Sequence, residues 1–87
     1  MLMAGTRTTV AINGYALREL RVRSGIGVAD LAEQVGVQRP YVAKIELGHS
    51  RRVSPKVYNA LLSALAIEDR RVLMANPYVD DVEQVPA

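Results

Sequence analysis

Cationic side chains gather in one short stretch of the sequence, and their chemistry is the binding of anions. Residues 39–56 contain one acid, Glu46, and five cations: Arg39, Lys44, Arg51, Arg52 and Lys56. Guanidinium and ammonium groups donate hydrogen bonds to phosphate oxygens, and guanidinium also matches the O6 and N7 acceptors of guanine. A solvated basic face without a partner is the simpler alternative. The position of the cluster favours a surface that meets a phosphate backbone.

Two short helical patterns must position these cations, and the first covers residues 28–35. Leu31 and Val35 lie four apart, on one face of a helix, and Ala32 beside them lets a second helix approach closely. Gly36 follows the last apolar residue, where glycine most easily adopts a left-handed cap. The sequence therefore predicts a helix that ends in a tight turn.

The second helical pattern covers residues 39–47. Gln38 stands where a side chain could cap it, and Pro40 falls in the first turn, where a missing N–H costs little. Val42 and Ile45 are three apart and face inward. The outward face then holds Arg39, Ala43 and Lys44. Two helices of about two turns, joined by a short turn with a glycine, form a helix-turn-helix.

The residues from Leu17 to Ile67 resemble the Cro/phage-repressor (Xre-like) helix-turn-helix family. Four pieces in order carry the resemblance: Leu-Arg-Glu-Leu-Arg (17–21), Ala-Asp-Leu-Ala-Glu-Gln-Val-Gly-Val (29–37), Val-Ala-Lys-Ile-Glu-Leu-Gly (42–48) and Leu-Leu-Ser-Ala-Leu-Ala-Ile (61–67). The resemblance implies a mainly α fold, a lambda-repressor-like bundle of four to five helices. It also implies a sequence-specific, double-stranded DNA-binding transcriptional regulator with residues 39–47 in the major groove.

Carried onto this sequence, the resemblance assigns roles to individual residues. Base contacts are expected from Arg39, Pro40, Tyr41, Ala43 and Lys44. Phosphate contacts are expected from Gln38, His49, Ser50, Arg51 and Arg52. Arg21 is expected to pair with Glu46 through a bidentate guanidinium–carboxylate contact.

The sequence departs from the family pattern at three positions. Gly27 replaces the usual Ser or Thr cap, and Val28 replaces a polar residue that often reaches a phosphate. Pro40 occupies a position that often reads a base, where it offers only apolar contact, such as with a thymine methyl. The apolar Val28 and Pro40 favour an alternative, a protein-interaction module on the same fold, such as an antitoxin or anti-repressor.

The remaining segments predict further elements around the helix-turn-helix. Asn13 caps a helix that runs to Ser24, and Ser54 caps another whose core stripe repeats every four residues at Val57, Leu61 and Leu65. Residues 68–75 suit a fifth helix or a strand equally. Thr8–Ile12 is rich in β-branched residues and predicts a short strand, which could pair antiparallel with Arg71–Ala75 within one chain or between two.

These elements define the expected domain organisation. Residues 1–12 form an N-terminal arm or strand, 13–76 the helix-turn-helix domain and 77–87 an acidic C-terminal tail. A single recognition helix reads few base pairs, so a homodimer on DNA is expected, with half-sites about 34–36 Å apart.

Composition and the lack of certain motifs argue against several other classes of function. The 87 residues, of net charge +2, suit one domain, and the lack of cysteine fits a reducing cytoplasm. Neither a long apolar run nor a signal-peptide core is present, so no membrane partner is expected. His49 is the only histidine, and no catalytic or metal-binding spacing occurs. We therefore expect no enzyme, cofactor, metal or small-molecule substrate.

Overall fold

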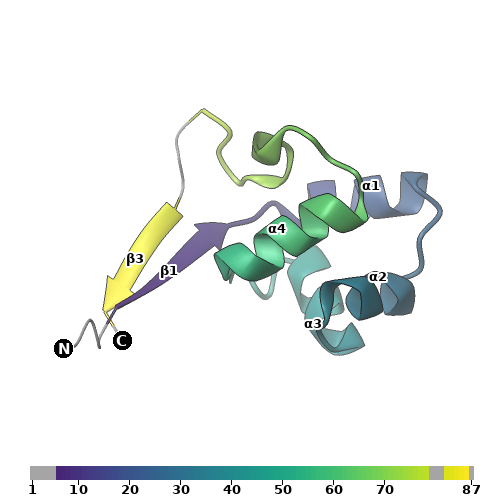
Figure 1. The fold of residues 1–87 in the computed structure, drawn as a ribbon, viewed down its shortest axis with the longest axis horizontal. Coiled ribbons are helices and arrows are strands. Elements are labelled where there is room, and N and C mark those ends of the chain that lie inside the picture. The colour runs from purple at the N-terminus through teal and green to yellow at the C-terminus, as the bar shows by residue number, and fades with distance from the viewer. Residues whose placement is uncertain (1–5, 79–81, 87) are drawn as a thin grey trace.

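The computed structural model describes residues 6–78 and 82–86, which form four α-helices, one 3₁₀ helix and three strands. In chain order these are β1 (Thr6–Ala11), α1 (Gly14–Arg23), α2 (Val28–Val35), α3 (Arg39–Glu46), β2 (Arg52–Val53), α4 (Pro55–Ala64), η1 (Arg70–Leu73) and β3 (Val82–Pro86). The helices form the body of the molecule, and the paired strands β1 and β3 extend to one side of it (Figure 1).

Local sequence signals set the helix ends as predicted. The Asn13 side chain accepts a hydrogen bond from the Ala16 N–H at 3.0 Å and so caps α1, and Ser54 caps α4 in the same way through the Val57 N–H. The bounds of α2 match the prediction, and Gly36 ends it with a φ of 87°. Gln38 is the exception, because it occupies the cap position of α3 without bonding through its side chain.

The core lies where α2, α3 and α4 meet the inner end of β1. Leu31, Val42 and Ile45 are fully buried, as their spacing predicted. The predicted stripe on α4 is rotated: Tyr58 is fully buried with Leu61, whereas Val57 is only partly buried. A buried phenol needs a partner, and the Tyr58 hydroxyl donates to the Arg70 carbonyl. Burial raises the pKa of Tyr58, although the charge of Arg70 opposes the shift.

The three strands form one antiparallel sheet in the order β2-β1-β3. β1 is central: Val10 pairs with Val53 of β2 on one side and with Val82 of β3 on the other. The expected pairing of an N-terminal strand with a C-terminal one is confirmed, and of the two alternatives it is the one within a single chain. Its expected location, Arg71–Ala75, is wrong except for an isolated bridge between Ile12 and Met74.

The segment 68–75 is neither a full helix nor a strand. The Asp69 side chain accepts from the Arg71 N–H and begins the 3₁₀ turn of η1, which buries Leu73. The chain becomes extended again only at Met74, which leaves one residue to pair with Ile12. The strand that fills the expected role is β3, within the segment 77–87 that was expected to be an acidic tail. Residues 79–81 and 87 of the expected tail lie outside the described residues.

Candidate nucleic-acid interface

The turn between α2 and α3 fixes how α3 is presented. Gly36 and Val37 both donate their N–H groups to the Ala32 carbonyl, at 2.8 and 3.0 Å, so the chain reverses within three residues. Val37 packs against the core at this corner. Because Val42 and Ile45 are buried, the opposite face of α3 is held toward solvent.

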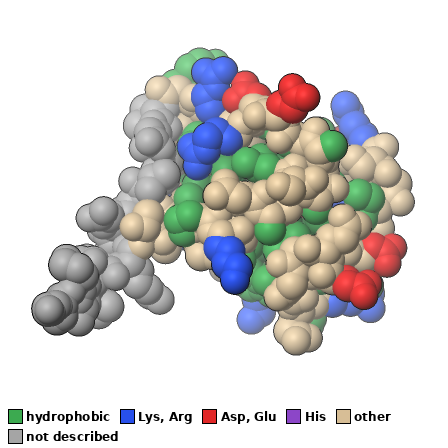
Figure 2. All heavy atoms as spheres, in the orientation of Figure 1, with side chains coloured by type: hydrophobic (Ala, Val, Ile, Leu, Met, Phe, Trp, Pro, Cys, Tyr) green, Lys and Arg blue, Asp and Glu red, His purple; other side chains and the backbone are tan. Residues whose placement is uncertain are grey.

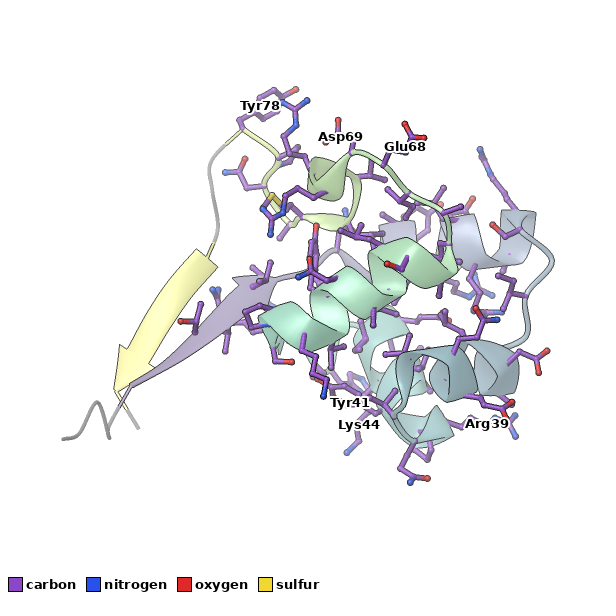
Figure 3. The ribbon with its side chains drawn as sticks, viewed as in Figure 1. Arg39, Tyr41, Lys44, Glu68, Asp69 and Tyr78 are labelled. Carbon is purple, nitrogen blue, oxygen red and sulfur yellow. The ribbon has the colours of Figure 1, made fainter. Side chains whose placement is uncertain are left out.

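The outward face of α3 carries the cations expected to contact bases. Arg39, Pro40 and Lys44 are exposed, whereas Tyr41 and Ala43 are half-buried. Tyr41 packs partly against the core. Figure 3 shows Arg39, Tyr41 and Lys44 along the edge of the molecule formed by α3, on the opposite side from Glu68 and Asp69. The α3 edge therefore carries positive charge on the side of the molecule opposite Glu68 and Asp69.

An ion pair anchors the other end of α3 to α1. Arg21 Nε donates to Glu46 Oε2 at 2.6 Å, and a second guanidinium nitrogen donates to Oε1 at 3.1 Å, which is the bidentate contact implied by the resemblance. Arg21 also donates to the Ile26 carbonyl at 2.8 Å, so it joins α1, the following loop and α3. The hydrogen bond to Glu46 raises the pKa of Arg21, against an opposing effect of burial.

The loop after α3 holds the residues expected to contact phosphates. His49 and Ser50 donate their N–H groups to the Lys44 carbonyl at 2.9 and 3.1 Å, and the Arg51 carbonyl accepts from the Ile12 N–H at 2.9 Å. The loop is thus fixed both to α3 and to the end of β1. Gln38, before α3, is exposed.

The two loop arginines differ in their surroundings. Arg51 is exposed, and its Nε donates to the nearby Gly48 carbonyl at 3.2 Å. Arg52 is half-buried, and its Nε donates to the Thr9 hydroxyl of β1 at 2.7 Å. Arg51 is therefore the more available cation, and Arg52 also ties the loop to the sheet.

Three residues near this surface were missed by the sequence analysis. Gly14 lies against the end of α3, and a methyl group there would come within 1.9 Å of the Ile45 carbonyl oxygen. Tyr15 and Leu47 are large apolar residues that are 67% and 69% exposed. Their exposure could have been predicted from their positions on the helices. Tyr15 lies two residues from the buried Leu17, and Leu47 lies two residues from the buried Ile45, which places both off the apolar stripes.

The geometry agrees with comparisons to known proteins. The model of a family described as "Helix-turn-helix domain" matches residues 14–73, which is more than half of the chain. The chain belongs to this helix-turn-helix family. Its members share the two-helix unit with a tight turn, and in DNA-binding proteins built on this unit the second helix is the recognition helix.

A solved structure is similar over most of the domain. It is the restriction-modification controller protein C.AhdI from Aeromonas hydrophila, 39% identical, with a TM-score of 0.62. The similarity covers 68% of this chain and 86% of C.AhdI. The comparison with curated proteins gives no significant match. β1 and β3 both lie outside the matched residues 14–73.

Among the described residues, no helix is long and apolar enough to cross a membrane. Within the same part of the chain, no three His, Asp or Glu side chains come together as a metal site would require.

Proposed function

We propose that this protein is a sequence-specific, double-stranded DNA-binding transcription regulator whose helix α3 enters the major groove. The observation that carries the proposal is the outward face of α3, with Arg39 and Lys44 exposed on a helix held in place by the Arg21–Glu46 pair. Similarity to C.AhdI, a controller protein, supports a regulatory role. Exposed guanidinium and ammonium groups on a rigid helix suit the acceptor pattern of guanine in the major groove.

Roles within the interface follow from burial. Arg39 and Lys44 read base edges, Pro40 offers apolar contact, and the half-buried Tyr41 and Ala43 set how closely α3 approaches the bases. Gln38, His49, Ser50 and Arg51, with Arg52, contact the phosphates and set the register of the protein on the duplex. Two copies bind two half-sites as a homodimer, since one helix reads too few base pairs for useful specificity.

The apolar Val28 no longer favours a protein-interaction module. It is half-buried at the start of α2 and packs against the core, so its apolar character serves the fold. The polar contact that this position often makes is replaced, in the proposal, by the free N–H groups at the start of α2. Pro40 remains as the one exposed apolar residue of α3 that a protein partner could use.

A salt titration of binding tests the proposal. We expect the affinity for an operator duplex selected from random sequences to fall steeply between about 50 and 200 mM salt, because phosphate contacts release counterions. Sedimentation of the complex is expected to give two protein chains per duplex. A chain that selects no duplex, or a partner interaction that hardly responds to salt, would instead identify a protein-interaction module.

Arg39→Ala is expected to weaken operator binding by about 1–3 kcal/mol and to relax the preference at one base position, since a bidentate guanine contact carries sequence information. Arg71→Ala is the control, because Arg71 is an exposed cation that pairs with Asp69, and Figure 3 places Asp69 on the side of the molecule opposite α3. The measurement is affinity for a set of duplexes that differ at single positions. Equal losses on all of them would make Arg39 a phosphate contact.

Arg51→Ala is expected to weaken specific and non-specific duplexes alike and to lower the salt slope by about one. The melting temperature should hardly change, since Arg51 is exposed. Arg52→Ala is expected to lower both the slope and the melting temperature, because it also loses the bond to Thr9. If the salt slopes of both variants equal that of the unchanged protein, these arginines do not contact phosphates.

A further inference from the structure

A surface groove of about 610 Å³ lies between the start of α1 and the end of α3. Tyr15 lines it from α1 and Leu47 from the end of α3, and both side chains are about two-thirds exposed. Single exposed apolar residues are ordinary, but two large ones lining one groove indicate a contact surface. Neither side chain is needed for the core, which is complete beneath them.

The charge of the groove selects the kind of partner. Arg51 and Arg52 line it, and the acid among the lining residues is Glu46. The Glu46 side chain is only 6% exposed and is neutralised by Arg21. The exposed Arg51 guanidinium therefore adds positive charge to the apolar walls of the groove, which suits a partner that is anionic but has apolar faces.

The position of the groove favours one such partner. Arg51 belongs both to the groove and to the loop that contacts phosphates in the proposed function. Because Tyr15 and Leu47 line the same groove as Arg51, a DNA strand held by Arg51 would lie beside both side chains, and a different occupant would compete with it. A sugar–phosphate backbone offers both an anion and the apolar face of deoxyribose.

We propose that this groove receives the DNA backbone beside the bases read by α3. The Tyr15 hydroxyl donates to a phosphate oxygen, and Leu47 packs against the adjoining deoxyribose. These contacts position α3 along the DNA major groove and carry no base information. The inference rests on the proposed function, which it extends from α3 and its loop to the start of α1.

The test compares Tyr15→Phe and Leu47→Ala with the unchanged protein on the selected operator duplex. Tyr15→Phe is expected to bind at least about tenfold more weakly, as for one hydrogen bond to an anionic oxygen, and Leu47→Ala about three- to tenfold more weakly, as for one apolar contact. The salt slope should not change, because neither variant removes a charge. This separates both from Arg51→Ala, which lowers the slope. Melting temperatures should match the parent protein, because both side chains are exposed.

Tyr78→Phe and Val22→Ala are the matched controls. Both residues are exposed large apolar side chains outside the groove, and Figure 3 places Tyr78 on the side of the molecule away from α3. Both controls are expected to bind DNA as the parent protein does.

Phosphate ethylation identifies the contact directly. One ethylated phosphate is expected to weaken the parent protein but to add nothing to the loss in Tyr15→Phe. Parent-like affinity of both variants, with Arg39→Ala and Arg51→Ala behaving as predicted, would overturn this inference alone. A lower sedimenting mass of the DNA-free variants would also overturn it, by making the groove a contact between protein copies. Absence of DNA binding by the parent protein would overturn the proposed function as well.

Discussion

Glu46→Ala is expected to lower the free energy of unfolding by up to about 3–5 kcal/mol, the value for a fully buried ion pair. The substitution leaves the Arg21 guanidinium, whose side chain is only 12% exposed, without its carboxylate. A buried charge that loses its partner keeps the cost of its removal from water. For a domain of this size, each kcal/mol corresponds to roughly 4–8 °C in melting temperature, so thermal unfolding should show the loss clearly.

Glu19→Ala is the control for this prediction. Glu19 also pairs with an arginine, Arg23, but at 3.6 Å and with side chains that are 39% and 78% exposed. An exposed helical pair of this kind contributes about 0.3–0.5 kcal/mol. Equal melting temperatures for Glu46→Ala and the parent protein would show that the pair does not stabilise the fold.

Gly14→Ala is expected to destabilise the protein by about 1–3 kcal/mol or more, through overpacking. The added methyl group would lie 1.9 Å from the Ile45 carbonyl oxygen and 2.9 Å from its carbonyl carbon. These are backbone atoms, so no rotamer change relieves the clash, and α1 must move away from the end of α3. The same movement would strain the Arg21–Glu46 pair, and operator affinity should fall together with the melting temperature.

Gly27→Ala is the matched control for Gly14→Ala. Its added methyl group would meet only a side-chain oxygen of Asp30, at 3.6 Å, and its φ of −75° suits any residue. Alanine is a poorer cap than glycine but narrows the unfolded ensemble, so the net change should stay within about 0.5 kcal/mol. If Gly14→Ala melts as Gly27→Ala does, α1 and α3 are less closely packed than described.

The outward direction of the cationic side chains of α3 could be predicted from the sequence. Figure 2 shows basic side chains at the lower edge of the molecule, where α3 lies, and also at the upper edge beside acidic ones, and it shows further acidic side chains over α2. In a short helix with two buried residues, Val42 and Ile45, the remaining positions are assigned to the outer face by the helical period alone. Arg39 and Lys44 were therefore placed correctly before any contact was known.

The site residues whose environment was not foreseen are those whose partners are distant in sequence. Arg52 was expected to contact a phosphate, and its bond to Thr9, 43 residues away, was not foreseen. Tyr58 was not among the residues predicted for the core stripe of α4, yet it is fully buried, and Arg70 supplies the acceptor for its hydroxyl. Neither the helical period of α4 nor a capping residue in α4 or in the loop after α3 indicates these distant partners.

The sequence by itself determined the helices and the helix-turn-helix, because their signals act within four residues. Asn13 bonds to Ala16, Ser54 to Val57, and Gly36 ends α2 through its own backbone conformation. The tertiary structure alone decided which segments pair with β1 and that Gly14 must lack a side chain. β1 has β-branched residues, which suit pairing with any strand. The folded positions of η1 and of the loop after α3 determine that one edge of β1 pairs with β2 and the other with β3. Gly14 is likewise required by a carbonyl 31 positions further along the chain, which comes near it only after α1 and α3 have packed.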